Sequence, residues 1–227
     1  MHEHLCYSSF RQPGCKTKRR TMTAQPKRYT TEQEYVVFER ASTTKHEYYA
    51  GEVFAMAGGT IRHNIIATNT VALLHSQLRG TPCRALNSDM RVKVLATGLQ
   101  TYPDVTVICG QPLFLDTSQD VIVNPTIIIE VLSPSTEAYD RGLKSQNYRM
   151  IETLREYFLV SQDKHHIEHY IRQDNGQWVF NEASDSDARM SIPTINAELI
   201  FTEIYDGVDI SGEDPAPTRT PPGNAAT

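Results

Sequence analysis

Two acidic residues stand in or beside apolar segments that are typical of buried strands. Asp104 precedes the run Val-Thr-Val-Ile, and Glu130 lies inside the apolar run Thr126–Leu132. A carboxylate in such a run is costly to bury unless it is paired or bound to a metal. Two carboxylates that converge from neighbouring strands would suit a hard divalent cation, which prefers oxygen ligands. The alternative is that Glu130 pairs with a buried Arg or Lys, and on the residues alone both interpretations stay open.

A lysine follows the second acid in a position from which it could return to the site. After Glu130 the chain leaves the strand through Ser133-Pro-Ser-Thr, and Asp140-Arg-Gly-Leu-Lys144 falls on the next predicted helix. The Lys144 amine could reach over the strand end and stabilise a developing negative charge or position a water. The alternative is a surface lysine on a solvated helix face, which the spacing alone favours.

The elements that must position these residues alternate between helix and strand, without an internal repeat. Thr30 and Thr31, each followed three residues later by Gln33 or Glu34, predict a capping box that opens a first helix through Phe38. Apolar periodicity predicts further helices over 61–78 and 138–153. Strands are expected at 47–56 (two, hinged at 50–51), 91–95, 104–109, 126–132, 156–160, 166–171 and 178–181. This order predicts an α/β or α+β fold with helices around one mixed sheet.

The composition is that of a globular protein with one domain. The chain has 227 residues, of which 39% are hydrophobic and 22% charged. Residues 1–28 hold seven Lys or Arg and one acid, which leaves 15 of the 22 basic and 26 of the 27 acidic residues for the remainder. An acidic body argues against strong non-specific binding to nucleic acid, but it does not oppose a site that gathers metal ions.

The two ends of the chain differ from its middle. Residues 1–28 are polar, basic and aperiodic, which predicts a disordered extension, with Met22 a plausible start. Residues 211–227 are rich in Pro, Gly, Thr and Ala, which predicts a disordered tail. The folded domain is therefore expected at 29–210. No apolar run is long enough to span a bilayer and no secretion signal stands at the start, so we expect a cytoplasmic protein without membrane contact.

Four cysteines are present, without a CxxC motif or any close pair. In a chain long enough to build its own core, this pattern predicts no disulfide framework. Cys83 and Cys109 fall in strand-like segments and are predicted to be small core residues.

Taken together, several segments resemble the Uma-type restriction endonuclease family of the PD-(D/E)XK nuclease superfamily. The resemblance covers nearly all of residues 29–206, in order. Its most specific part is Glu130-Val-Leu-Ser-Pro-Ser-Thr followed by an Asp and a Lys on a helix, whereas Pro-Asp alone is weak. The matching segments are Tyr29-Thr-Thr-Glu-Gln-Glu-Tyr, Glu47-Tyr-Tyr-Ala-Gly-Glu-Val-Phe-Ala-Met-Ala-Gly-Gly, His63, Tyr102-Pro-Asp-Val, Glu130-Val-Leu-Ser-Pro-Ser-Thr, Asp140-Arg-Gly-Leu-Lys-Ser-Gln-Asn-Tyr and Glu156-Tyr-Phe-Leu-Val.

The resemblance implies a restriction-endonuclease-like core in which Asp104 and Glu130 bind Mg²⁺ or Mn²⁺. The lysine expected two residues after the Glu is Leu132 here, and the family pattern moves that role to Lys144. Glu47 matches the early acid that often completes such a site as a metal ligand, although it could be a plain strand-edge carboxylate. His63 is also at a family-like position, although it could be a semi-buried helix residue. Gln146 and Tyr148 share the Lys144 helix and could line the site.

The predicted reaction is therefore hydrolysis of a phosphodiester by a homodimeric, metal-dependent endonuclease. Its predicted catalytic residues are Asp104, Glu130, Lys144, Glu47 and His63, of which Asp104, Glu130 and Glu47 are the predicted metal ligands. DNA as the substrate and the homodimer both come from the family resemblance. One alternative is a catalytically inactive relative that binds nucleic acid or a protein partner. Another is a metal-dependent hydrolase of small phosphate esters.

Overall fold

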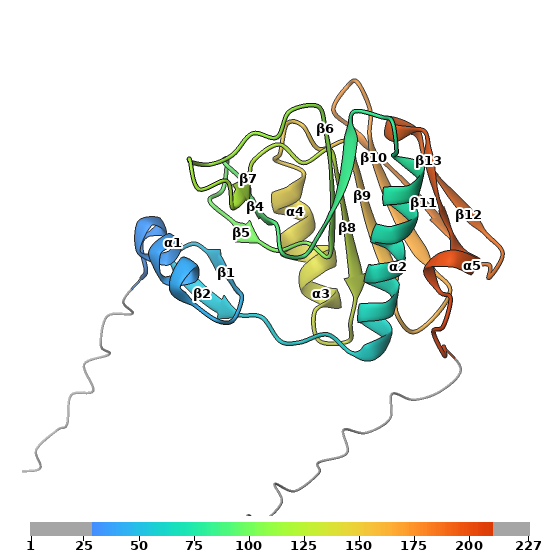
Figure 1. Cartoon of the computed structure of the whole chain (residues 1–227), viewed down its shortest axis with the longest axis horizontal. Coiled ribbons are helices and arrows are strands. Elements are labelled where there is room, and N and C mark those ends of the chain that lie inside the picture. The colour runs from blue at the N-terminus through green and yellow to red at the C-terminus, as the bar shows by residue number, and fades with distance from the viewer. Residues whose placement is uncertain (1–28, 211–227) are drawn as a thin grey trace, which may run out of the picture.

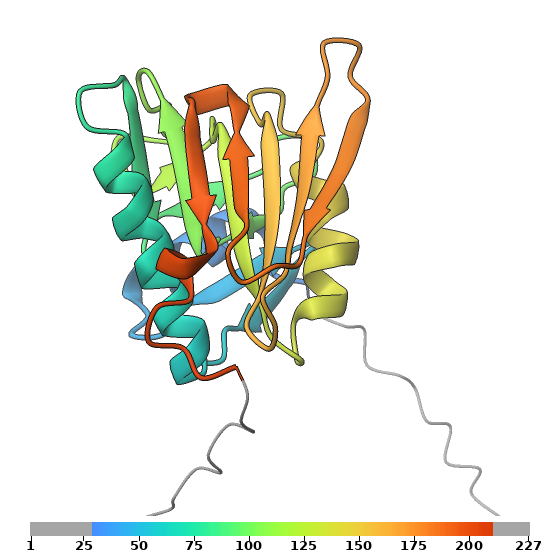
Figure 2. The same ribbon diagram turned by 90° about the vertical axis from the view of Figure 1, so that its right-hand side faces the viewer.

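The computed structural model describes residues 29–210. The predictions for residues 1–28 and 211–227 lie outside the described residues. A six-stranded mixed sheet forms the centre, with helices beside it and a smaller sheet across one of its faces (Figures 1 and 2). The predicted fold class, a mixed central sheet flanked by helices, is confirmed.

The central sheet has the order β11-β10-β9-β8-β6-β3. Its members are β3 (Cys83–Asn87), β6 (Val105–Cys109), β8 (Ile127–Leu132), β9 (Glu156–Ser161), β10 (Ile167–Arg172) and β11 (Trp178–Ala183). Strands β8 and β9 run parallel and every other neighbouring pair in this sheet runs antiparallel. All six residues of β8 are buried, as expected for a strand covered on both faces.

The prediction of a single sheet is wrong. A five-stranded sheet has the order β2-β1-β5-β4-β7, and β12 pairs with β13 in a separate hairpin. Strands β1, β2 and β4 match the strands predicted at 47–56 and 91–95, but β5, β7, β12 and β13 have only two to four residues and were not predicted, because so short a strand shows little periodicity. Their bounds are β1 (His46–Tyr49), β2 (Glu52–Ala55), β4 (Arg91–Lys93), β5 (Gln100–Thr101), β7 (Val121–Ile122), β12 (Arg189–Ile192) and β13 (Ala197–Ile200).

Two of the three predicted helices are confirmed. Helix α1 (Glu32–Ala41) begins with the capping box of Thr31 and Glu34, and α2 (Ile61–Gln77) is capped by Thr60. The third is shorter than predicted, and it consists of α3 (Glu137–Tyr139), a π-helical turn (Asp140–Lys144) and α4 (Ser145–Tyr148). A 3-10 turn (Pro193–Ile195) and helix α5 (Phe201–Ile204) complete the described elements.

Apolar side chains form two core layers, one on each face of the central sheet. Along β8, Ile127, Ile129 and Val131 face the layer that contains α2 and α5. Ile128 and Leu132 face the other layer, which contains Tyr148 and the strands of the five-stranded sheet. Because side chains alternate along a strand, Glu130 points into this second layer.

Cys83 and Cys109 lie opposite each other in β3 and β6 and are joined by a disulfide. The prediction of no disulfide is therefore wrong for this pair. Both residues do contribute to the core, as predicted. They are 26 positions apart in the sequence, and only the strand register brings them together.

Between residues 29 and 210, no helix combines the length and the apolarity needed to cross a membrane.

Candidate active site

Asp104 and Glu130 meet at one end of the central sheet. Strands β6 and β8 are antiparallel neighbours, and Val105 pairs with Ile129 in their register. The acid that precedes β6 therefore lies beside the last residues of β8. The backbone N–H of Asp104 donates to Glu130 Oε2 at 3.3 Å, and the N–H of Val131 donates to Asp104 Oδ2 at 2.8 Å. The convergence expected from the sequence is present in the structure.

Lys144 reaches this end of the sheet from the π-helical turn. Its Nζ lies 3.0 Å from Glu47 Oε1, 3.2 Å from Glu130 Oε1 and 3.2 Å from Asp140 Oδ1. The Lys144 side chain is only 7% exposed, so the alternative of a solvated surface lysine is wrong. Asp140 and Lys144 are the first and last residues of the π-helical turn, and both are buried and contact each other. Such turns often occur at functional sites.

Two hydroxyl groups fix the carboxylates around the amine. The Tyr148 hydroxyl donates to Glu130 Oε1 at 2.7 Å. The Thr101 hydroxyl, from β5, donates to Glu47 Oε1. Oε1 of Glu130 is therefore held by Lys144 and Tyr148, while Oε2 faces the backbone of Asp104.

His63 approaches Asp104 from the first turn of α2. Its backbone N–H donates to the side chain of the N-cap Thr60, which fixes the helix start. Its Nε2 lies 3.1 Å from Asp104 Oδ2. Gly59 leaves room for the imidazole ring, since a Cβ on this glycine would lie 2.7 Å from His63 Nδ1. The glycine is thus required by the close approach of the ring.

Negative charge exceeds positive charge in this cluster. Three carboxylates (Glu47, Glu130 and Asp140) contact the Lys144 ammonium group, and a fourth, Asp104, lies beside Glu130 and contacts His63. Burial raises the pKa of Glu130 to about 8, against the effect of Lys144 and with the help of the charges on Asp140 and Asp104. Burial likewise raises the pKa of Asp140. Burial alone would lower the pKa of Lys144, but the surrounding carboxylates, Glu130 first, raise it well above its usual value.

The donor set fits a hard divalent cation. Asp104 and Glu130 present carboxylate oxygens at one strand end, and Glu130 Oε2 is not used by Lys144 or Tyr148. The four carboxylates outnumber the Lys144 ammonium and the His63 imidazole together, so added positive charge would stabilise the cluster. Within residues 29–210, no group of three or more His, Cys, Asp or Glu side chains is arranged so that it could hold a metal ion, so the protein ligands at this strand end are two carboxylates. Glu47, the expected third ligand, contacts Lys144 and Thr101 instead.

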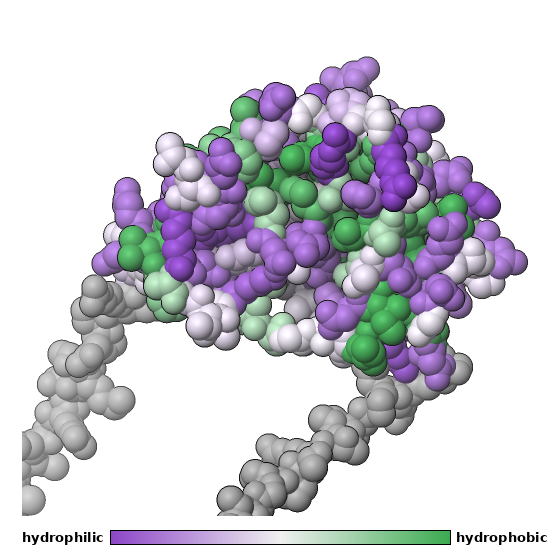
Figure 3. Space-filling model, in the orientation of Figure 1, coloured by the Kyte–Doolittle hydropathy of each residue, from purple (hydrophilic) through white to green (hydrophobic). Residues whose placement is uncertain are grey.

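The space-filling view shows that this side of the molecule is largely hydrophilic. In Figure 3, hydrophilic residues gather between α1 and the central sheet, and apolar residues show in the upper middle, at the lower right and at the left edge. Asp104 and His63 are the most open members of the cluster, with side chains 15% and 18% exposed. A ligand would therefore meet these two residues before the buried Lys144.

Comparison with known proteins agrees with this geometry. A family model described as "Putative restriction endonuclease" (Uma2) matches residues 32–202. The chain belongs to the Uma2 family. Two proteins of Synechocystis sp. (strain ATCC 27184 / PCC 6803 / Kazusa) are similar to it. The uncharacterized protein slr1290 is 36% identical over 78% of this chain and 91% of its own length, and the uncharacterized protein sll1609 is 35% identical over 70% and 90%.

A solved structure supports the fold assignment. The crystal structure of a putative nuclease belonging to DUF820 from Anabaena variabilis ATCC 29413 superposes with a TM-score of 0.63. The match covers 77% of this chain and 97% of that chain, at 16% sequence identity. At this identity the likeness shows a shared nuclease fold.

The structure also shows contacts at the site for Asp140 and Thr101, for which the sequence predicted no role. In this Uma2 chain Asp140 is the fourth carboxylate, and Thr101 holds Glu47. Tyr148 lines the site, whereas Gln146, expected as another lining residue, is exposed. Asp140, Lys144 and Tyr148 recur every four residues, and this spacing is the one signal that could have grouped them.

Proposed function

We propose that this chain is a divalent-metal-dependent endonuclease that hydrolyses phosphodiester bonds in DNA. The observation that carries the proposal is the meeting of Asp104 and Glu130 with the Lys144 amine at one end of the central sheet. Membership of the Uma2 family supports nuclease chemistry, and it supports a nucleic acid as substrate.

Asp104 and Glu130 would hold Mg²⁺ or Mn²⁺, with Glu47 as a possible further ligand once it separates from Lys144. A divalent cation, when bound, would lower the pKa of a coordinated water and stabilise negative charge on a phosphate. Tyr148 keeps Oε1 of Glu130 in place, so the other oxygen stays directed toward Asp104. His63 orients Asp104 through the bond to its Oδ2.

Lys144 would act as a charged donor. Its pKa is raised by the carboxylates around it, so the amine stays protonated and does not serve as a base. From its position next to Glu130 it would stabilise negative charge on the phosphate in the transition state or hold the attacking water. Lys144, on a helical turn, would then take the role that the superfamily pattern gives to a lysine at position 132, which is a leucine here.

A second candidate is a protein that has the nuclease fold but binds nucleic acid or a protein partner without cutting. The acidic balance of the chain, with 27 acidic against 22 basic residues, favours this candidate because it weakens attraction to a phosphate backbone. We further propose a cytoplasmic homodimer, with one site for each DNA strand. Sedimentation that shows only monomer at micromolar concentration would contradict the dimer.

The test is a plasmid-cleavage assay with Mg²⁺, with Mn²⁺ and with chelator, using the full chain, Asp104→Ala and Asp89→Ala. Asp89 is a matched control because its side chain is 76% exposed and pairs with Lys45, away from the site. We expect cleavage by the full chain and by Asp89→Ala, only with metal, and none by Asp104→Ala. Stabilisation by Mn²⁺ without cleavage would favour the non-cutting candidate, since metal binding alone raises the melting temperature.

A further inference from the structure

Strand β2 carries an exposed aromatic side chain on the same side as the candidate active site. In the register of β1 and β2, Phe54 lies directly opposite Glu47, and such cross-strand partners point to the same face with Cβ atoms about 5 Å apart. The other face of this hairpin is covered by α1, where the rings of Tyr35 and Tyr48 stack with centroids 4.9 Å apart. Phe54 therefore neighbours the carboxylate that contacts Lys144 Nζ at 3.0 Å.

A second aromatic ring borders Glu47 from α3. Tyr139 is the last residue of this helix and is half-buried, and its ring centroid lies 5.4 Å from Lys144 Nζ. Burial first, and then the negative charge of Glu47, raise the pKa of the Tyr139 hydroxyl above its usual value, so the tyrosine lies close to this carboxylate. Two aromatic side chains from different elements thus border the acidic cluster.

Phe54 is the more open member of this aromatic pair. Its exposed fraction is 45%, whereas that of Glu47 is 6%, and β2 is an edge strand of the five-stranded sheet. A single exposed apolar residue is ordinary on a protein surface. What distinguishes Phe54 is its place beside a buried acidic cluster, where a ligand that approaches the cluster can contact the ring.

Stacking on this ring would offset the weak electrostatic attraction between the chain and DNA. The chain has 27 acidic against 22 basic residues, which weakens attraction to a phosphate backbone. Base–aromatic stacking does not depend on net charge, and it accepts every base because every base has a π face. A base can lie on a protein ring only after it leaves its neighbours, which costs free energy in a duplex and least in an unpaired strand.

We propose that Phe54 stacks on a nucleobase of the substrate and that the site therefore selects single-stranded or locally unpaired DNA over an intact duplex. The inference rests on the proposed nuclease function and adds a substrate class to it. Phe54 is then a specificity-determining residue that binds the strand, whereas Asp104, Glu130 and Lys144 act on the phosphate.

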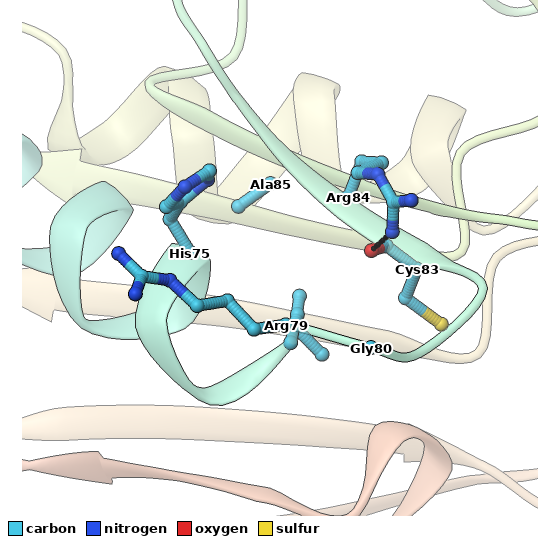
Figure 4. Close-up of a pocket in the computed structure, with 7 residues that line it drawn as sticks. His75, Arg79, Gly80, Cys83, Arg84 and Ala85 are labelled. Atoms are coloured by element: carbon cyan, nitrogen blue, oxygen red, sulfur yellow. Dashed lines mark hydrogen bonds between the residues drawn. The ribbon is translucent and has the colours of Figure 1, made fainter.

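A cavity at the other end of α2 supplies a control. It has a volume of about 220 Å³ and lies between the end of the helix and the edge strand β3, with Arg79 and Arg84 among its lining residues. In Figure 4 the guanidinium groups of these two arginines point apart, so they do not converge on one ligand. Helix α2 has 17 residues, so this cavity is about 25 Å from the helix end that carries His63. Arg79→Ala therefore removes a cation without touching the proposed stacking position.

The experiment measures binding of a short labelled oligonucleotide, as a single strand and as the matching duplex, by fluorescence polarisation in Ca²⁺. The full chain is compared with Phe54→Leu, which keeps an apolar side chain without a π face, and with Phe54→Trp, which keeps an aromatic ring. Phe180→Leu is the matched control, because Phe180 is 49% exposed and lies in β11, at the far edge of the central sheet from β3 and three strands from β8. Thermal melts of all variants check that the fold is kept, and cleavage of both substrates is measured in Mg²⁺.

We expect the full chain to bind the single strand more tightly than the duplex. Phe54→Leu should lose at least about fivefold in affinity for the single strand and little for the duplex. Phe54→Trp should keep the preference, and Phe180→Leu and Arg79→Ala should bind as the full chain does. Tighter binding of the duplex, an unchanged single-strand affinity in Phe54→Leu, or an equal loss in either control variant would overturn the proposal.

The two proposals fail separately in this experiment. A single-strand preference that depends on Phe54, without cleavage of either substrate in Mg²⁺, would contradict the nuclease function and leave the stacking role in place. Metal-dependent cleavage by the full chain with no effect of Phe54→Leu on binding or on kcat/KM would contradict the stacking role alone.

Discussion

Two buried glutamates in adjacent strands of the same sheet have opposite surroundings. Glu130 lies in β8 and Glu156 begins β9, the parallel neighbour, and their side chains are 4% and 0% exposed. Glu156 accepts a hydrogen bond from Thr194 N–H at 2.8 Å on one oxygen and contacts His169 Nε2 at 2.6 Å with the other. Each of its two carboxylate oxygens therefore has a hydrogen-bond partner, and no second acid shares them.

Glu130 belongs to a group in which acids outnumber cations. Lys144 is shared between Glu47, Glu130 and Asp140, and Asp104 lies beside them. The comparison shows that a buried carboxylate does not by itself mark a functional site. The excess of buried carboxylates over cations around Glu130 is what supports the proposed site, because a structural ion pair is balanced and this cluster is not.

The largest expected difference is in metal binding. Glu130→Gln should weaken Mn²⁺ binding by at least about tenfold, since a charged oxygen ligand is lost. The metal-free variant should be as stable as the parent or more stable, because the neutral amide avoids the cost of burying a carboxylate among other acids, which the raised pKa of Glu130 reflects. The amide oxygen can keep the contacts of Oε1 with Tyr148 and Lys144, and the hydrogen bond that is lost, from Asp104 N–H, is long at 3.3 Å. Calorimetric titration and a thermal melt give the two quantities. A strongly destabilised variant that binds Mn²⁺ normally would make Glu130 a structural partner of Lys144 only.

The corresponding substitution at Glu156 should lower the stability of the protein and leave metal binding unchanged. Glu156→Gln leaves one carbonyl oxygen for two donors, so either His169 or the Thr194 N–H loses its partner. We expect a loss of about 1–3 kcal/mol in the free energy of unfolding, with unchanged Mn²⁺ affinity. Denaturant unfolding measures the first and titration the second. A change in Mn²⁺ affinity in this variant would show that the two glutamates are not independent.

The sequence predicted the strand that carries Glu130, but it did not predict the side-chain contacts of the acidic cluster. The apolar run around Glu130 and the capping box at Thr31 have local periodicity or fixed spacing, and both elements are confirmed. The partners of Glu47 could not be predicted, because they come from the two-residue strand β5 and from the π-helical turn. Neither element shows a helical or strand periodicity in its sequence.

The same limit applies to the paired cysteines and to the third helix. Cys83 and Cys109 are brought together only by the register of β3 and β6. The segment 138–153 has helical periodicity, and the sequence does not show where the backbone widens into a π-helical turn. Asp140 therefore looked like an ordinary helix residue, although its carboxylate is buried at the site.

A third test concerns what holds the π-helical turn in place. Arg141, between Asp140 and Lys144, points away from the site and bonds to Glu168 of β10 through its Nε at 3.1 Å. Arg141→Met should cost about 1 kcal/mol of stability. It should also lower kcat more than it changes KM, because Lys144 is then less well positioned. The double charge exchange Arg141→Glu with Glu168→Arg should restore part of kcat. An unchanged kcat would show that the turn keeps its position without this tether.

The smallest effect is expected at an acidic pair on the surface. Arg40 binds both Asp116 and Asp120, and its hydrogen bonds hold the pKa of each carboxyl below its usual value. A depressed pKa in the folded protein means that the stabilisation is present above the pKa of the unfolded chain and is lost as the pH falls through the folded value. Arg40→Met should therefore melt below the parent at pH 7, by a small margin because the pair is exposed. The difference in melting temperature should shrink as the pH is lowered from 6 toward 3, and it should also shrink with added salt. A difference that stays constant with pH would mean that Arg40 stabilises α1 by packing alone, and the contrast between balanced and unbalanced acids would then not extend to the surface.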